Sequence, residues 1–124
     1  QIGCNHIFHC GAGLGSFTVG YDGFFRLCSS LGHPDCIYDL RKGSLKDAWE
    51  NFVFKVRDMR SKDKEFLDNC HRCALFNLCR CCPAHAYLET GKLDAVVEYF
   101  CKIAHSRAEK IFNLPNIHLT TSCK

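Results

Sequence analysis

A dense run of cysteines near the middle of the chain carries the clearest chemistry in the sequence. It contains Cys70, Cys73, Cys79, Cys81 and Cys82. Two cysteines separated by two residues can curl around a metal, because so short an arc turns both sulfurs inward and aims backbone N–H groups at them. Thiolates are soft ligands that suit iron–sulfur clusters and zinc. The run therefore predicts a soft-metal site, and iron–sulfur binding is the favoured interpretation.

Cys82 is followed directly by Pro83. This pair resembles the Cys-Pro that closes the cysteine run of bacterial ferredoxins, where the last cysteine binds a different cluster from its neighbours. The same separation is expected here.

The cysteine content alone would also suit a disulfide scaffold, but three features argue against one. The chain has 11 cysteines among 124 residues, an odd number. Cys81 and Cys82 are adjacent, which is poor geometry for a disulfide between them, and no signal peptide opens the sequence. We therefore expect reduced, metal-binding thiols and a cytoplasmic location.

Size and charge set limits on the partners. At 124 residues the chain is one small domain or part of a larger protein. A net charge of +3 with scattered signs is too weak to indicate nucleic-acid binding, and no apolar run approaches the roughly 20 residues that span a bilayer. We expect a soluble domain with no nucleic-acid or membrane partner. Because Met59 is the only methionine, we expect a piece of a longer chain, with residues 113–124 as a tail or linker.

The elements that must position the cysteines begin with a predicted β-hairpin. Residues 17–19 and 24–27 are β-prone and flank an Asp-Gly turn, which is a strong hairpin signal. Cys10 precedes the first strand and Cys28 ends the second, so we expect their sulfurs to lie close together. Residues 29–42 are predicted to form a loop.

Four helical segments are predicted after the hairpin. They run from Ser44 to about Met59, from Ser61 to Phe66 or Leu67, from Pro83 to Gly91, and from Asp94 to about Phe112. Ser44 opens a capping sequence before apolar residues at helical spacing, and Pro83 and Gly91 suit the start and end of a helix. The prediction is an α+β fold: a small domain stabilised by metal clusters, in which a short β-hairpin is followed by helices and a Cys-rich loop.

Taken together, these residues resemble a SPASM domain, the C-terminal extension of many radical S-adenosylmethionine enzymes that modify peptides and proteins. The family pattern is a Cys, nine to fifteen residues, Gly, four residues and Cys, then C-x2-C-x5-C-x3-C, then a lone Cys. Cys10, twelve residues, Gly23, four residues and Cys28 match the first part. The later parts are matched by Cys70, Cys73 and Cys79 and by the lone Cys101. Residues 43–49 also resemble the family's Ser-Leu-Lys-Glu-Ile-Trp helix start.

The resemblance implies two auxiliary 4Fe–4S clusters. Cys10, Cys28 and Cys82 would bind the first cluster. Cys70, Cys73, Cys79 and Cys101 would bind the second cluster. All of these cysteines would be ligands, and no residue of the chain is expected to act as a catalytic acid, base or nucleophile.

The chain departs from the family pattern within the cysteine run. Two residues, not three, separate Cys79 from Cys82. Either Cys82 binds through a tighter loop or Cys81 replaces it, and the retained Cys-Pro pair favours Cys82. Cys36 and Cys123 have no place in the pattern and are expected to be free thiols.

A second departure concerns the first cluster. Many relatives have a fourth cysteine shortly after the first, but the Gly-rich segment after Cys10 has none. Cys4, His9 or an open iron could complete the site. His6 and His9 are otherwise expected to face solvent.

The chain also lacks the C-x3-C-x2-C motif that leaves one iron open for S-adenosylmethionine. It is therefore expected to be a non-catalytic domain or partner of a radical S-adenosylmethionine enzyme, with that cofactor bound only by an N-terminal catalytic domain that this chain does not contain. Its expected roles are electron transfer and the binding of a peptide or protein substrate.

Two alternatives belong to other functional classes. A structural zinc module would use the same thiolates without redox chemistry. A thiol–disulfide oxidoreductase would use Cys70 and Cys73, but the expected βαβ surroundings are missing. In the iron–sulfur interpretation, removal of the metal is expected to unfold the domain.

Overall fold

The protein is described here from a computed structural model that covers residues 5–79 and 81–113. The strands are β1 (Thr18–Val19), β2 (Phe24–Arg26) and β3 (Ile37–Asp39), and the helices are α1 (Leu45–Asp47), α2 (Val53–Arg57), α3 (Lys64–Phe66), α4 (Pro83–Thr90) and α5 (Glu98–Phe112). Two π-helical turns, η2 (Ala48–Phe52) and η3 (Leu67–His71), and two 3-10 turns, η1 (Pro34–Cys36) and η4 (Phe76–Leu78), complete the described elements. The fold is α+β, as expected. Cys4, Cys123 and residues 114–124 of the expected tail lie outside the described residues.

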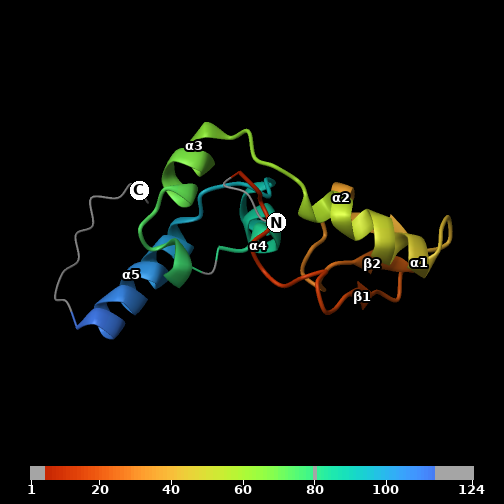
Figure 1. The fold of residues 1–124 in the computed structure, drawn as a ribbon, viewed down its shortest axis with the longest axis horizontal. Helices are drawn as coiled ribbons and strands as arrows, with labels where there is room; N and C mark the ends of the chain where they lie inside the picture. Colours follow the sequence, from red (N-terminus) through yellow and green to blue (C-terminus); the bar gives the residue numbers. More distant parts are fainter. Residues whose placement is uncertain (1–4, 80, 114–124) are drawn as a thin grey trace.

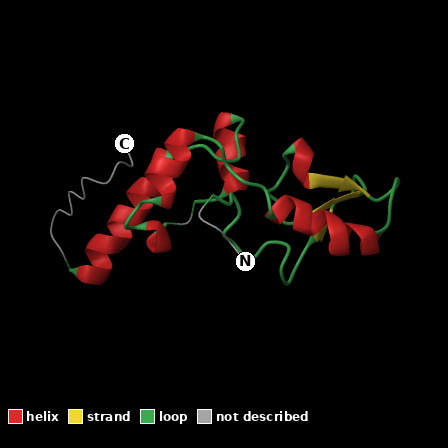
Figure 2. Cartoon of the chain, turned by 45° about the horizontal axis from the view of Figure 1, so that its top comes forward, coloured by secondary structure: helices red, strands yellow, loops and turns green. Residues whose placement is uncertain are grey.

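The molecule is elongated, with different elements at its two ends. Figure 1 shows the sheet, α1 and α2 at one end, α5 at the other, and α4 between them. Figure 2, in a different orientation, shows the strands confined to the sheet end. Two predicted ligands of the first cluster come from different parts of this shape, because Cys28 follows β2 and Cys82 precedes α4.

The predicted hairpin is confirmed. β1 pairs antiparallel with β2, and Thr18 lies opposite Arg26. The turn uses Gly23 in the left-handed conformation, with φ of 80°, which glycine adopts without steric cost. Asp22 supports the turn, because its carboxylate accepts hydrogen bonds from the backbone N–H of Phe24 and from the Arg26 guanidinium.

A third strand corrects the prediction of a loop over residues 29–42. β3 pairs antiparallel with β2, and Tyr38 lies opposite Phe25. The strand has three residues and follows a stretch broken by Gly32 and Pro34. It is too short to show an alternating pattern, so its pairing depends on the neighbouring strand.

The helix predicted from Ser44 forms, but it ends at Arg57 and contains a π-helical turn. The Ser44 side chain accepts the backbone N–H of Asp47 at 3.1 Å, as a capping residue should. α1, η2 and α2 follow one another without a break. Because the π-helical turn adds a residue to the repeat, the buried positions differ from those that a regular helix would give. The buried residues are Ala48, Val53 and Val56, whereas Leu45 is exposed.

Two predicted helix caps are wrong. The N-cap of α3 is Asp63 instead of Ser61, and α5 begins at Glu98 instead of near Asp94. Ser61 and Asp94 bond each other, with the Ser61 hydroxyl donating to the Asp94 carboxylate at 2.7 Å. α4 forms as predicted, with Pro83 in its first turn and Gly91 in the left-handed conformation after its last residue.

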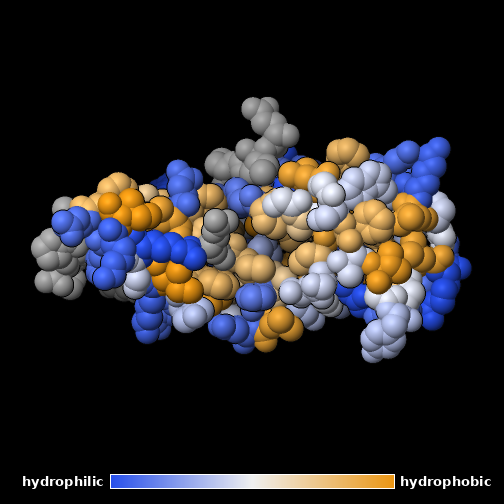
Figure 3. All heavy atoms as spheres, turned by 90° about the horizontal axis from the view of Figure 1, so that it is seen from below, coloured by the Kyte–Doolittle hydropathy of each residue, from blue (hydrophilic) through white to orange (hydrophobic). Residues whose placement is uncertain are grey.

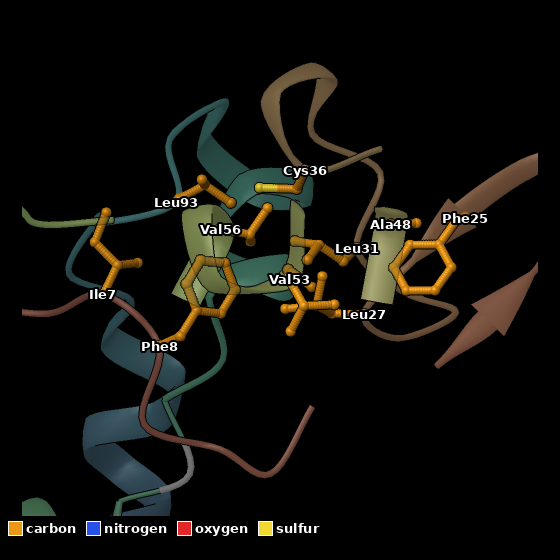
Figure 4. Packing of buried hydrophobic residues seen from close by; sticks show 11 residues of the cluster. Ile7, Phe8, Phe25, Leu27, Leu31, Cys36, Ala48, Val53, Val56 and Leu93 are labelled. Carbon is orange, nitrogen blue, oxygen red and sulfur yellow. The ribbon is translucent and has the colours of Figure 1, made fainter. Parts of the chain in front are cut away.

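The main core lies between the sheet, α2 and α4, and it consists almost entirely of hydrocarbon side chains. Its largest fully buried members are Phe25, Leu27, Leu31, Val56 and Cys36. Figure 4 shows side chains from the N-terminal segment, the sheet region and α2 meeting in this core.

Apolar side chains also reach the surface, as is common in folded proteins. Figure 3 shows hydrophobic residues along the middle of one face and hydrophilic residues toward both ends. Phe54 of α2 and Tyr99 of α5 are among the exposed ones. No helix within the described ranges combines the length and apolar character needed to cross a membrane.

Candidate metal centres

The four cysteines predicted to bind the second cluster line one small hollow, which we call the α5 hollow. They are Cys70, Cys73, Cys79 and Cys101, and Cys81 lines the hollow with them. The remaining lining residues are Phe76, Ala95, Val97 and Phe100. Thiols from segments up to 31 positions apart are thus brought to one apolar space.

Successive turns position the first three of these cysteines. Cys70 lies in η3, which continues α3. The cysteine run was expected to be a loop, but its first residues are helical. The backbone N–H of Cys73 donates to the Cys70 carbonyl at 3.3 Å, which curls the C-x2-C segment. The N–H of Cys79 then donates to the Leu75 carbonyl at 2.9 Å, so η4 returns the third thiol to the same side.

The fourth cysteine comes from the last helix. Cys101 is 5% exposed and lies on the buried face of α5, together with Ala104 and Ala108. Arg107 joins this helix to η4, because its guanidinium donates to the Leu78 carbonyl at 2.9 Å. This hydrogen bond fixes the residue just before Cys79 against the helix that carries Cys101.

The electrostatics of the α5 hollow fit a bound cationic centre. The pKa of Cys70 is raised to about 12, mainly by burial and also by the neighbouring thiols of Cys101, Cys79 and Cys73. Thiolates packed together in an apolar space repel one another, so several cannot ionise there without a compensating positive charge. Iron bound by these sulfurs would supply that charge.

Cys79 differs from Cys70 because two neighbours favour its thiolate. A hydrogen bond from the Cys81 side chain and the nearby Arg107 cation both lower the pKa of Cys79, against the effect of burial. The pKa of Cys81 is raised correspondingly.

A site already arranged around one metal ion is not found among the described residues. Within residues 5–79 and 81–113, no three His, Cys, Asp or Glu side chains are placed to hold a single metal ion. A structural zinc site needs sulfurs about 2.3 Å from one ion. In a 4Fe–4S cluster each cysteine binds a different iron, so the sulfurs surround a volume instead of one point.

A second hollow contains part of the predicted first cluster site, and we call it the Cys10 hollow. Its lining includes Cys10 and Cys82 together with Cys81. The other lining residues are His9, Phe76, Asn77 and Cys79. Two of the three cysteines assigned to the first cluster are thus brought together across 72 positions of sequence.

The third of these cysteines, Cys28, does not line the Cys10 hollow. It follows β2 and is half-buried against the main core. Its convergence with Cys10 stays a prediction, as does the ligand role of Cys4, which lies outside the described residues.

The structure places Cys81 and Cys82 differently. Cys81 lines both hollows, whereas of these two hollows Cys82 lines only the one with Cys10. Cys82 is also the N-cap of α4, and Pro83 follows as its first residue. This placement agrees with the ferredoxin-like separation of Cys82, but its choice over Cys81 stays a prediction.

The histidines are less exposed than expected. His6 is buried, and its Nε2–H donates to the Asp58 carboxylate at 3.0 Å, so the expectation that it faces solvent is wrong. His9 is half-buried and contacts the rings of Phe76 and His71. Burial lowers the pKa of His71, whose Nε2 is enclosed and has no hydrogen-bond partner among the described residues.

Sequence reasoning missed several residues around the hollows. His71, Asn77 and Arg107 carried no prediction, because no motif marks them and their positions depend on contacts with distant segments. The only sequence feature that could have drawn attention to His71 is its place between Cys70 and Cys73. By contrast, Cys36 was expected to be a free thiol, and it is buried in the main core with its Sγ 3.9 Å from the Met59 sulfur.

Disulfides play no part in the described residues, since none of their nine cysteines forms one. The disulfide scaffold that composition alone would allow is therefore not seen in this part of the chain.

Comparison with known proteins adds an independent line of support. A family model described as SPASM, an iron–sulfur cluster-binding domain, matches residues 10–74, just over half of the chain. An uncharacterized protein of Archaeoglobus fulgidus is 29% identical over 99 residues, which cover 77% of this chain and 23% of the relative. The chain therefore spans about a quarter of that relative's length. No solved structure matches this chain. On the family match, the chain belongs to the SPASM family of iron–sulfur cluster-binding domains.

Proposed function

We propose that this domain binds two 4Fe–4S clusters and serves as the auxiliary domain of a radical S-adenosylmethionine enzyme that modifies a peptide or protein. The observation that carries the proposal is the meeting of Cys70, Cys73, Cys79 and Cys101 at the α5 hollow. The family pattern assigns these four thiols to one cluster. The thiols come from η3, the segment after it, the residue after η4, and α5, and a shared inorganic centre explains why such separate segments meet.

When bound, a cluster would supply one-electron transfer at a potential that its surroundings set. The chain's own residues contribute those surroundings. Val97 and Phe100 exclude water from one side of the α5 hollow, and both are buried. The Cys81 side chain and the Arg107 cation both favour negative charge on the Cys79 sulfur. Hydrogen bonds and positive charges near cluster sulfurs make reduction easier.

The remaining parts of the proposal extend to partners and location. The missing C-x3-C-x2-C motif assigns radical formation to a separate catalytic domain, and the longer Archaeoglobus relative has room for further domains. In this arrangement the domain passes electrons and helps hold the peptide, and S-adenosylmethionine binds elsewhere. Cytoplasmic conditions would keep the thiols reduced for cluster assembly.

The test is anaerobic purification of the 124-residue chain, reconstitution with iron and sulfide, and quantification of iron, sulfide and zinc per chain. Two clusters give about eight irons with matching sulfide. About one or two zinc ions without sulfide would instead establish the structural zinc alternative. A folded protein that takes up neither iron nor sulfide would refute the proposal.

A further inference from the structure

The ligand set that the family pattern gives for the first cluster is one residue short of four. The family pattern supplies Cys10, Cys28 and Cys82, and the segment that follows Cys10 offers no further thiol before Cys28. His9 lines the same hollow as Cys10 and Cys82. Among the residues that line this hollow, His9 is the one whose side chain offers a nitrogen that commonly binds metals.

The hydrogen bonding of His9 determines which ring nitrogen could bind iron. Its Nε2 lies 2.8 Å from the His6 carbonyl oxygen. A carbonyl only accepts, so Nε2 must carry the proton and Nδ1 must carry the lone pair. Metal-binding histidines commonly donate their second nitrogen to a backbone carbonyl in this way, which fixes the tautomer and the ring orientation.

Both the carbonyl and the ring are held in place. The backbone of the His6 segment pairs with the segment after α2, where the N–H of Ile7 donates to the Met59 carbonyl at 3.0 Å. The His9 ring packs edge-on against Phe76, with 4.9 Å between the ring centroids. The His9 side chain would therefore lose little conformational entropy when its ring binds a metal.

From this geometry we infer that His9 is the fourth ligand of the first cluster and binds iron through Nδ1. The inference rests on the proposed function, since it needs a cluster bound by Cys10 and Cys82. A neutral imidazole in place of a thiolate removes one negative charge from the ligand set, and histidine ligation raises the potential of iron–sulfur centres. His9 would thus set the potential of the first cluster above that of a cluster bound by four cysteines.

The decisive measurement is pulsed electron paramagnetic resonance of the reduced, reconstituted chain, grown with natural or 15N-labelled histidine. We expect a nitrogen coupling from a directly bound imidazole that changes with the label. His9→Cys should abolish the coupling, keep the iron content and lower the potential of one cluster. His9→Ala should also abolish it. His85→Ala is the matched control, because His85 is an exposed histidine on α4, and it should leave the coupling intact.

The outcomes separate this inference from the proposed function. A chain that binds no iron and sulfide refutes the proposed function before His9 is tested. A chain with two clusters but no label-dependent coupling, or with a coupling that survives His9→Cys, overturns the histidine ligand alone. Loss of first-cluster iron in Cys4→Ser, with unchanged spectra in His9→Cys, would assign the position to Cys4.

Discussion

Cys101 and Cys36 are both buried cysteines, yet their surroundings differ. Cys101 lines the α5 hollow with three other predicted ligands, whereas Cys36 packs in the main core beside Met59. We predict that Cys101→Ala lowers the iron content of the reconstituted chain from about eight toward about four per chain, because one cluster loses a ligand. Cys36→Ala should keep about eight irons.

The comparison is controlled for burial, since each change removes one buried sulfur. Circular dichroism should show that both variants retain helical structure before their iron is compared. Equal iron loss in the two variants would contradict the assignment of Cys101.

Cys81 and Cys82 provide a second comparison at the residue scale. Cys82 lines the Cys10 hollow and is the N-cap of α4, whereas Cys81 lines both hollows and lowers the pKa of Cys79. We predict that Cys82→Ala loses about half of the bound iron and that Cys81→Ala keeps nearly all of it. Iron and sulfide analysis of both variants checks this expectation, and the reverse result would make Cys81 the ligand.

At the scale of elements, the glycine of the family pattern has a physical role. Gly23 has φ of 80° in the hairpin turn, and a Cβ there would meet no atom closer than 3.8 Å. The cost of Gly23→Ala is therefore that of the left-handed backbone, about 1–2 kcal/mol of unfolding free energy. Thermal unfolding should show a melting temperature several degrees lower.

Gly32→Ala is the matched control for this change. A Cβ at Gly32 meets nothing within 4 Å, and its φ lies outside the left-handed region. This variant should be as stable as the unchanged chain or slightly more stable, because alanine restricts the unfolded chain. An equal loss of stability in both variants would remove the conformational explanation.

Arg107 joins two elements that carry cysteines. Its hydrogen bond to the Leu78 carbonyl holds η4 against α5, and the contact is partly buried. Arg107→Gln should lower the free energy of unfolding of the reconstituted chain by about 1.5 kcal/mol, the usual contribution of a hydrogen bond with a charged donor. Denaturant unfolding under anaerobic conditions measures the difference.

Arg60→Gln serves as the control for Arg107. Arg60 pairs with Asp58 at 3.4 Å on the surface, where such pairs contribute little. Its substitution should change the unfolding free energy by less than that of Arg107. If the two variants are equally stable, the Arg107 contact does not hold the two elements together.

Elements with strong local signals could be predicted from the sequence. The Asp-Gly turn fixed the expectation of the hairpin, and Pro83 with Gly91 bounded α4. The errors occurred where distant contacts decide the structure. β3 depends on pairing with β2, and the capping side chain expected at Ser61 bonds Asp94 from another segment.

The candidate sites divide in the same way. Cysteine spacing and the family pattern identified four of the thiols that line the α5 hollow, but not Cys81, which lines it with them. It could not reveal that His6 is buried, that Arg107 reaches Leu78, or that Cys28 does not line the Cys10 hollow. Those features arise from packing between segments, for which a single sequence carries no signal.

At the scale of the whole molecule, the two ends depend on different interactions. The sheet end has a continuous hydrocarbon core around Phe25, Leu31 and Val56 (Figure 4). The α5 end has two small apolar clusters, against which cysteines pack. Those clusters are Leu75, Ala104 and Ala108, and Ala86, Val97 and Phe100. Alanines bury little apolar area, so we expect this end to need metal–thiolate bonds for its stability.

Removal of the metal should therefore act mainly on the α5 end, which narrows the expectation that the whole domain unfolds. After anaerobic chelation, backbone amides of α5 (Glu98–Phe112) should lose hydrogen-exchange protection, because the ligand bond through Cys101 no longer holds the helix. Amides of β2 and α2 should keep most of theirs, since the buried members of their core are hydrocarbon side chains and Cys36, and the predicted ligands Cys28 and Cys82 pack only against its edge. Hydrogen exchange followed by mass spectrometry resolves the two regions. Unchanged protection in α5 would show that apolar packing alone holds this end, and loss throughout would restore the expectation of global unfolding.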